Sequence, residues 1–172
     1  MSEQGQPEAP ADQWTPPEGS WASSAATRRS MLGNRNRDTA PELLLRSLVH
    51  SAGLRYRVAA KPLPKMRRTA DMVFRPVKVA VFIDGCFWHG CPEHFVMPKT
   101  NRPYWEDKID RNIQRDRDTD NRLAEAGWLV LRFWEHLKPE ACAATVIEAV
   151  AARRQETEAS KRPRKTSWPP SR

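Results

Sequence analysis

The sequence predicts an α/β fold in which a mixed β-sheet is flanked by helices. Three segments place apolar residues at helical spacing, and four short runs are rich in β-branched and other apolar residues. Along the chain these segments follow the order α-β-β-β-α-β-α, which is typical of one sheet covered by helices. A chain of 172 residues has room for one such domain with tails, and that domain can bury a sizeable core.

The first helix is predicted to begin near Thr39, because residues 39–42 read TAPE and match the capping-box pattern. Leucines follow at helical spacing as far as Val49, and Gly53 provides the stop signal. The capping box accounts for Glu42 without any role in function.

The remaining elements are four strands and two helices. Strands are expected at residues 54–60, 72–74, 77–83 and 128–134. A long charged helix lies between the last two strands and ends at Gly127. Its apolar face carries Trp105, Ile109 and Ile113. A last helix is expected from Pro139 to about Arg154.

Charge and composition divide the chain into three parts. Residues 1–27 carry four acidic residues and no lysine or arginine, residues 28–150 carry 22 basic against 15 acidic residues, and residues 151–172 carry seven basic against two acidic residues. We expect residues 1–27 to be a disordered acidic, Pro-rich extension, residues 28–154 to form the domain, and residues 155–172 to be a disordered basic tail. A basic domain suits a polyanion, although a solvated basic surface gives the same composition.

The sequence contains no run of about 18 apolar residues, and its first residues are acidic and Pro-rich rather than basic and then apolar. Neither a membrane span nor a secretory signal is therefore expected. We predict a soluble, cytoplasmic protein with no membrane partner.

Soft metal ligands gather on a turn-rich stretch that contains two glycines and a proline. The first three candidates are Cys86, Cys91 and His94. Their spacing is typical of a zinc knuckle, and three cysteines are too few for a disulfide framework. His136 becomes the fourth ligand if the fourth strand lies beside the third, and His89 or Cys142 are weaker candidates for that place. The alternative is a pair of buried free cysteines with two surface histidines.

Two aspartates lie at the ends of predicted strands. Asp71 begins the second strand and Asp84 ends the third, so a turn between these strands would bring both carboxylates to one edge of the sheet. Two carboxylates beside a backbone carbonyl make an oxygen site that suits magnesium, which can bind phosphate and activate water. Taken singly, each aspartate also fits an ordinary position at a strand end.

Aromatic and basic side chains surround the cysteine-rich turn. Phe87 and Trp88 directly follow Cys86, and exposed rings among basic residues favour stacking on bases or insertion between them. The alternative is a small hydrophobic cluster under the knuckle. A nucleic-acid face is weakly supported by Met31, Trp105, Arg28, Arg29, Arg35 and Arg37.

These signals occur together in one family pattern. The matching stretches read RNRDTAPELLLR, ADMVF, VAVFIDGCFWHGCPEHF, YWEDKIDRNIQRDRDTDNRL and GWLVLRFWEH. From about Arg28 to His136 the chain resembles the very short patch repair (Vsr) endonucleases, which nick DNA beside T:G mismatches left by deamination of 5-methylcytosine. The resemblance implies a restriction-endonuclease-like fold, a structural zinc ion, and magnesium-dependent hydrolysis that leaves a 5′-phosphate.

The resemblance also implies roles in catalysis. Asp71 corresponds to the central magnesium-binding acid, and the backbone carbonyl of Ile83 to a second magnesium ligand. His89 resembles the catalytic histidine that activates water or donates a proton, and Glu42 the helix carboxylate bordering the site. Asp84 stands where well-known members carry a second catalytic histidine, so this residue is a further candidate for catalysis or for magnesium binding.

For zinc and DNA the resemblance implies two further sets of residues. The zinc positions fall on Cys86, Cys91, His94 and His136. The aromatics that insert beside the mismatch fall on Phe87, Trp88 and Trp105, while Met31 lies near a residue that enters from the minor groove.

The function predicted from the sequence is therefore strand nicking of double-stranded DNA at T:G mismatches. Two alternatives remain: a restriction-associated or defence nuclease of the same fold, and a non-enzymatic zinc-stabilised DNA-binding module. We expect a monomer in a bacterial cytoplasm, associated with the nucleoid when bound to DNA, with mismatch-repair proteins as further partners.

Overall fold

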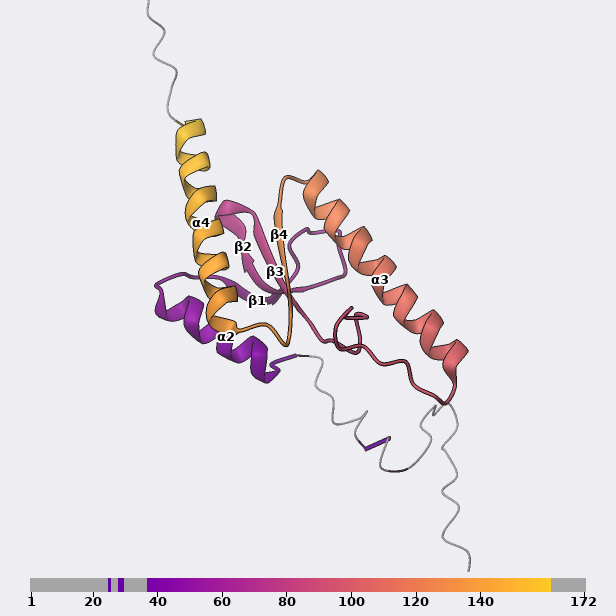
Figure 1. The fold of residues 1–172 in the computed structure, drawn as a ribbon. Helices are drawn as coiled ribbons and strands as arrows, with labels where there is room; N and C mark the ends of the chain where they lie inside the picture. The colour runs from indigo at the N-terminus through magenta and orange to yellow at the C-terminus, as the bar shows by residue number, and fades with distance from the viewer. Residues whose placement is uncertain (1–24, 26–27, 30–36, 162–172) are drawn as a thin grey trace, which may run out of the picture.

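The computed structural model describes residue 25, residues 28–29 and residues 37–161 (Figure 1). Its principal elements are α2 (Ala40–Ser51), β1 (Arg57–Ala60), β2 (Ala70–Phe74), the 3-10 turn η1 (Arg75–Val77), β3 (Val79–Asp84), α3 (Arg102–Glu125), β4 (Leu129–Trp134) and α4 (Pro139–Lys161). The predicted order of helices and strands is confirmed. No described helix combines the length and the apolar composition needed to cross a membrane.

The four strands form one mixed sheet in the order β1-β2-β3-β4. β2 pairs antiparallel with both β1 and β3, whereas β3 and β4 run parallel. The parallel pair requires a crossover, and the long helix α3 provides it. The mixed sheet predicted from the sequence is therefore confirmed.

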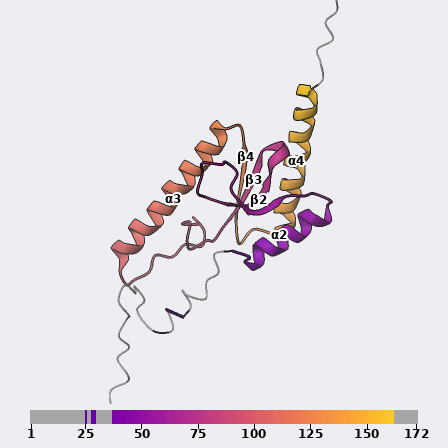
Figure 2. The ribbon, with the colours of Figure 1, turned by 180° about the vertical axis from the view of Figure 1, so that it is seen from behind.

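Helices cover both faces of the sheet. α2 and α4 lie together against one face, and α3 lies along the other, as the two opposite views show (Figures 1 and 2). The first face packs a core that joins α2 and α4 to the strands through Val49, Met72, Val81 and Val146. The second face packs a smaller cluster that includes Val73, Phe82, Leu123 and Trp128. Both faces of β3 are buried, which explains its continuous apolar sequence.

The N-terminus of α2 differs from the predicted capping box. Thr39 is the N-cap, but its side chain makes no capping bond to the helix backbone. Instead its hydroxyl donates to Glu42 Oε1 at 3.0 Å, and Glu42 Oε2 accepts from the backbone N–H of Asp38 at 3.0 Å. The physical reason is Arg46, which donates to the same Glu42 Oε2 at 2.7 Å and holds the carboxylate on its own side of the helix.

The predicted end of the last helix was wrong. α4 continues to Lys161, seven residues beyond Arg154, so residues 155–161 are helical rather than part of a disordered tail. These residues include glutamate, glutamine and alanine, which favour helix, and the first proline stands only at position 163. Arg153 also anchors this part of the helix by donating to Val77 O at 3.3 Å. Most of the two tail predictions falls on residues 1–24, 26–27 and 162–172, which lie outside the described residues.

Candidate active site and metal centre

The candidate site lies where the chain leaves the parallel strands β3 and β4. Asp84 ends β3 and Trp134 ends β4, and these residues are register partners, so the following turns begin side by side. The backbone N–H of Glu135 donates to Asp84 O at 3.0 Å, and the N–H of Cys86 donates to Glu135 Oε1 at 2.6 Å. Residues 85–95 and 135–138 are thereby tied together at one edge of the sheet.

The four predicted zinc ligands meet at this edge. Cys86 Sγ lies 3.1 Å from His136 Nδ1, and the Nδ1 atoms of His94 and His136 are 3.2 Å apart. Cys91 Sγ lies 3.8 Å from both histidine nitrogens. One ligand atom from each of the four residues lies within 4.8 Å of every other. The prediction that His136 lies beside the cysteine-rich turn is therefore confirmed.

These separations fit a tetrahedral zinc ion. With Zn–S near 2.3 Å and Zn–N near 2.0–2.1 Å, the edges of the tetrahedron measure about 3.3–3.8 Å. His136 also has an outer partner, because its Nε2 lies 3.6 Å from Glu93 Oε2. Burial and the neighbouring Cys91 raise the pKa of Cys86 to about 11, so a metal bound there would have to displace its proton.

The other proposed fourth ligands lie elsewhere. Cys142 is buried in α4 within the core on the α2 side of the sheet. His89 belongs to a second cluster, described below, with Asp84 and Asp116.

Gly90 allows the cysteine-rich turn to pack closely on α3. Its φ of +66° is in the left-handed region, and a Cβ there would lie 3.0 Å from Ile113 Cδ1 and 3.2 Å from Ile109 Cγ2. The two isoleucines predicted to form the apolar face of the long helix therefore support the turn. A side chain at position 90 would push the turn away from the helix.

Asp71 reaches this edge from β2. Its Oδ2 accepts a hydrogen bond from the backbone N–H of Ile83 at 2.7 Å. Among the described residues no lysine or arginine forms an ion pair with it. Burial, together with the charges of Glu42 and Asp84, raises the pKa of Asp71 to about 6 although the Ile83 bond and Arg46 act against this. A partly buried carboxylate with so little compensation would gain from a bound cation.

Glu42 lies near Asp71 but is already engaged. Both of its oxygens accept hydrogen bonds at the start of α2, and Arg46, which is 7% exposed, is its buried ion-pair partner. Its charge acts on Asp71, as the pKa of that group shows. The structure thus places the predicted helix carboxylate beside the site, where it supports α2 as well.

Asp84 and His89 belong to a charged network on the α3 side of the sheet. His89 Nδ1 lies 2.6 Å from Asp116 Oδ2 and 3.6 Å from Asp84 Oδ1. Arg132 Nη1 donates to both oxygens of Asp84, at 2.7 and 2.8 Å, and Arg132 Nη2 donates to Asp120 Oδ1 at 3.0 Å. The network joins β3, β4, α3 and the turn after β3.

The network sets the protonation of the histidine. Burial lowers the pKa of His89, but the hydrogen bond to Asp116 and the charges of Asp84 and Asp116 outweigh it and raise that pKa overall. Burial likewise raises the pKa of Asp116, and the bond from His89 outweighs this and lowers it. His89 Nδ1 is thus the donor to Asp116, and no described residue bonds to its Nε2.

The predicted DNA-contacting aromatics form a cluster. Phe87 lies edge-on to Trp88 at 5.1 Å between ring centroids and edge-on to Trp105 at 5.2 Å. Trp105 is only 5% exposed, so it supports the other two rings from α3. Lys108 Nζ lies 5.8 Å from the centroid of the Trp88 ring, which places a cation beside the cluster.

The predicted basic contacts are less well placed. Arg29 and Arg37 are exposed, and Arg28 is partly buried. Arg37 forms a surface ion pair with Asp38 at 3.6 Å. Met31 and Arg35 lie outside the described residues.

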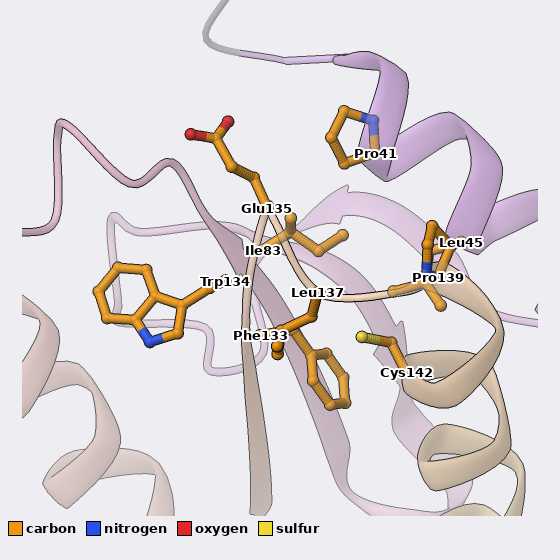
Figure 3. A pocket seen from close by; sticks show the side chains of 9 residues that line it. All are labelled: Pro41, Leu45, Ile83, Phe133, Trp134, Glu135, Leu137, Pro139 and Cys142. Atoms are coloured by element: carbon orange, nitrogen blue, oxygen red, sulfur yellow. The ribbon is translucent and has the colours of Figure 1, made fainter. Parts of the chain in front are cut away.

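A small apolar pocket lies on the other face of the sheet (Figure 3). It is lined by residues of α2, of β3 and β4, of the turn after β4 and of α4, among them Leu45, Ile83, Phe133 and Cys142. Neither Asp71 nor His89 lines it. This pocket is therefore separate from Asp71 and His89, although Glu135, which bonds to the Cys86 N–H, lines it.

Known proteins are similar in sequence to this chain. The family model described as DNA mismatch endonuclease Vsr matches residues 22–94. The type II nicking enzyme V.NaeI of Lentzea aerocolonigenes is 43% identical over 137 residues, which cover 74% of the chain and 78% of that relative. The DNA mismatch endonuclease Vsr of Escherichia coli K12 is 40% identical over 112 residues, which cover 64% of the chain and 70% of that relative. The chain belongs to the Vsr family of DNA endonucleases.

The resemblance inferred from the sequence is thereby confirmed. A further relative, the type II nicking enzyme V.NmeDIP of Neisseria meningitidis serogroup C, is 39% identical over 133 residues, which cover 72% of the chain and 84% of that relative. The family match spans the first three zinc-ligand candidates as well as Asp71 and His89. His136 and the α3 acids lie beyond it.

Sequence reasoning missed four residues of this candidate site. They are Asp116, Asp120, Glu135 and Arg132. One signal was available, because Arg132 is the single charged residue in the strand Leu129–Trp134. Such a charge inside an apolar strand indicates a buried partner. The acids of α3 carried no such signal, because that helix is charged along most of its length.

The state of Asp71 gives a stability prediction. Its native pKa of about 6 exceeds its ordinary value of 3.8, so the folded state loses stability as pH rises between these values. Asp71→Asn keeps an oxygen for the Ile83 N–H but has no such loss. With no magnesium added, the free energy of unfolding of the variant relative to wild type should rise by about 2–3 kcal/mol from about pH 4 to about pH 8.

Urea unfolding at both pH values measures this gain. Asp107→Asn is the matched control, because the Asp107 side chain is 64% exposed on α3. The stability difference between this control and wild type should change with pH much less than that of Asp71→Asn. A constant difference for Asp71→Asn would contradict the assignment of Asp71 as an uncompensated carboxylate.

Proposed function

We propose that this chain nicks double-stranded DNA beside T:G mismatches by magnesium-dependent phosphodiester hydrolysis, leaving a 5′-phosphate. The observation that carries the proposal is the single turn after β3. It holds His89 against Asp116, presents Phe87 and Trp88 beside it, and begins next to Ile83, to which Asp71 is bonded. Recognition and chemistry are therefore close together on one short segment. Membership of the Vsr family supports the same function.

We assign magnesium to the carboxylate of Asp71 and the backbone carbonyl of Ile83. The fit rests on Asp71, whose partly buried carboxylate has a pKa raised to about 6 and no ion-pair partner among the described residues. When bound, the ion would polarise the scissile phosphate and stabilise charge on the leaving oxygen. Glu42 contributes further negative charge at the border of the site.

His89 is assigned to proton transfer. Because Nδ1 donates to Asp116, the ring is fixed in one orientation and its Nε2 is left to exchange a proton with water or with the leaving oxygen. The acid Asp116 keeps the charged form of the ring stable, which suits a group that must gain a proton during the reaction.

Zinc is assigned to Cys86, Cys91, His94 and His136. The four side chains supply a complete tetrahedral set, so no position is left for water or substrate. We therefore propose a structural ion that fixes the turn after β3 to the turn after β4.

Contact with DNA is assigned first to the aromatic cluster. Trp88 is partly exposed, and its ring lies 5.1 Å from that of Phe87 and 6.1 Å from that of Trp105, measured between centroids. Rings so supported can stack against or enter between base pairs. The arginines Arg28, Arg29, Arg35 and Arg37, together with Met31, are proposed as contacts to the phosphates or the minor groove.

A second candidate keeps the chemistry and changes the target. The relatives from Lentzea aerocolonigenes and Neisseria meningitidis are named type II nicking enzymes. These names support the alternative of a restriction-associated nuclease of the same fold, for which we propose a target that does not depend on a mismatch. The choice of duplex in the next experiment separates the two candidates.

The direct test uses end-labelled duplexes that differ only at one position, T:G or C:G, with magnesium or with EDTA. We expect wild-type protein to nick the T:G strand in magnesium and neither duplex in EDTA. Asp71→Asn and His89→Ala should each slow nicking by at least about 100-fold, while mismatch binding persists. Extra magnesium or manganese should restore part of the Asp71→Asn rate and none of the His89→Ala rate.

The matched controls are Asp107→Asn and His50→Ala, both on exposed helical positions. They should nick at the wild-type rate. Equal nicking of both duplexes would favour the second candidate, and T:G binding without nicking would support a DNA-binding module instead.

Mismatch sensing by the aromatic cluster has its own test. Trp88→Ala should reduce the ratio of T:G to C:G binding by about tenfold, because one stacked ring contributes about 1–3 kcal/mol. Its affinity for the matched duplex should change much less, since phosphate contacts provide that part. Fluorescence anisotropy with both duplexes measures the ratio. An equal loss on both duplexes would show that Trp88 only supports the fold.

The zinc assignment predicts different outcomes for two buried cysteines. Cys91→Ala should lose the metal and unfold at a lower temperature, because one of four ligands is removed. Cys142→Ala is the control, since Cys142 is 5% exposed but lies in the core of α4. Elemental analysis should find about one zinc per chain in wild type and in Cys142→Ala, and far less in Cys91→Ala. Folded wild-type protein without metal would contradict the assignment.

A further inference from the structure

We propose that Arg132 is a positioning residue for His89, because its guanidinium group fixes the two carboxylates that face the Nδ1 of that ring. This inference deepens the proposed function and rests on it. It also gives a role to Asp84, which holds Arg132 and, with Asp116, orients His89.

The position of Arg132 is set by the sheet. It lies in the middle of β4, where its register partner on β3 is Phe82. The guanidinium carbon lies 4.7 Å from the centroid of the Phe82 ring, so the group is stacked on that ring. Only 22% of the Arg132 side chain is exposed. In this position the N–H groups of the guanidinium can still donate hydrogen bonds in the plane of the group.

The guanidinium group binds carboxylates from two elements at once. Nη1 donates to both oxygens of Asp84, on β3, and lies 3.6 Å from Asp116 Oδ1. Nη2 donates to Asp120 Oδ1 at 3.0 Å. Asp116 and Asp120 are one turn apart on α3, so the fork fixes that turn against the sheet. A lysine has one nitrogen and cannot span both sides.

This arrangement leaves Asp84 little capacity to bind a metal. Its side chain is 5% exposed and both oxygens are held by Arg132. The ligand atoms of Asp84, His89 and Asp116 are close enough for an ion, but Arg132 already supplies a positive charge beside them. The inference therefore assigns Asp84 to positioning rather than to magnesium binding.

The same contacts restrict His89. Its Nδ1 faces Asp116 at 2.6 Å and Asp84 at 3.6 Å, so the direction of the ring follows from where these two carboxylates stand. Arg132 touches both of them. If the guanidinium group is removed, two partly or fully buried acids repel each other and the ring loses its fixed partner.

The experiment compares Arg132→Met, Arg132→Lys and Arg132→Met/Asp84→Asn with wild type in single-turnover nicking of the T:G duplex. Arg122→Met is the control, because Arg122 is on α3 and 51% exposed. Binding is measured separately. The temperature is chosen so that every variant is folded by circular dichroism.

We expect Arg132→Met to slow single-turnover nicking by about 10- to 100-fold, with the dissociation constant for DNA changed less than about threefold. Arg132→Lys should recover part of the rate. In Arg132→Met/Asp84→Asn the unpaired charge of Asp84 is removed, so stability should recover, but nicking should remain slow because Arg132 no longer holds Asp116. If stability and nicking rate both recovered, the pair of Arg132 and Asp84 would only support the fold.

A spectroscopic readout separates this inference from the proposed function. In protein with ¹⁵N-labelled histidine, the Nδ1 proton of His89, assigned by its loss in His89→Ala, should be strongly downfield because Asp116 accepts it. Arg132→Met should shift or broaden this signal, and Arg122→Met should not. If wild type fails to nick T:G DNA, the proposed function fails, and this signal still tests Arg132. An unchanged signal and rate in folded Arg132→Met would overturn the inference.

Discussion

The parallel pairing of β3 with β4 is the constraint on which the candidate site depends. It places Asp84 opposite Trp134, so both strands release their chains at one edge and His136 returns to Cys86. A slip of two residues would move the second turn by about 6–7 Å along the strand. No such shift is compatible with ligand atoms that lie within 4.8 Å of each other. The register of β3 with β4 thus defines the candidate metal centre.

The two aspartates at this edge differ in whether a cationic side chain compensates their buried charge. Asp84 is held by a guanidinium that donates to both of its oxygens, and breaking such a pair commonly costs about 3–5 kcal/mol because a charge is left uncompensated. Burial raises the pKa of both groups, but Arg132 opposes the rise at Asp84, whereas Asp71 has no ion pair among the described residues and its pKa reaches about 6. The charged form of Asp71 therefore lowers the stability of the fold at the position where the proposed magnesium would bind. Asp84 is thus assigned to support of the site, and Asp71 to binding of the proposed magnesium ion.

The sequence predicted most of the fold because the strands and helices carry strong local signals. β3 is apolar as far as Asp84, and the apolar face of α3 at Ile109 and Ile113 supports the cysteine-rich turn at Gly90. The end of α4 was missed because residues 155–161 are both polar and helix-forming, and polarity is equally typical of a disordered segment. Composition could not tell an exposed helix from a tail.

The site was predicted as far as its residues are adjacent in sequence or follow a family pattern. The zinc set needed only one long-range assumption, the pairing of two strands. The Arg132 network needed three elements at once, and the acids Asp116 and Asp120 are two of many on a charged helix. Such a network is specified by the crossing of α3 over the sheet rather than by local spacing. The sequence therefore showed that Asp84 departs from the family pattern, but it did not show that Arg132 is the partner of Asp84.

The central claim is that one four-ligand metal centre ties the turn after β3 to the turn after β4 and so fixes the segment that carries both the aromatic cluster and His89. The most direct measurement is the X-ray absorption spectrum at the zinc edge of protein purified without added metal. The claim predicts two sulfur ligands near about 2.3 Å and two nitrogen ligands near about 2.0–2.1 Å. A shell with bound water, with fewer than two sulfurs, or with no zinc in folded protein would contradict it.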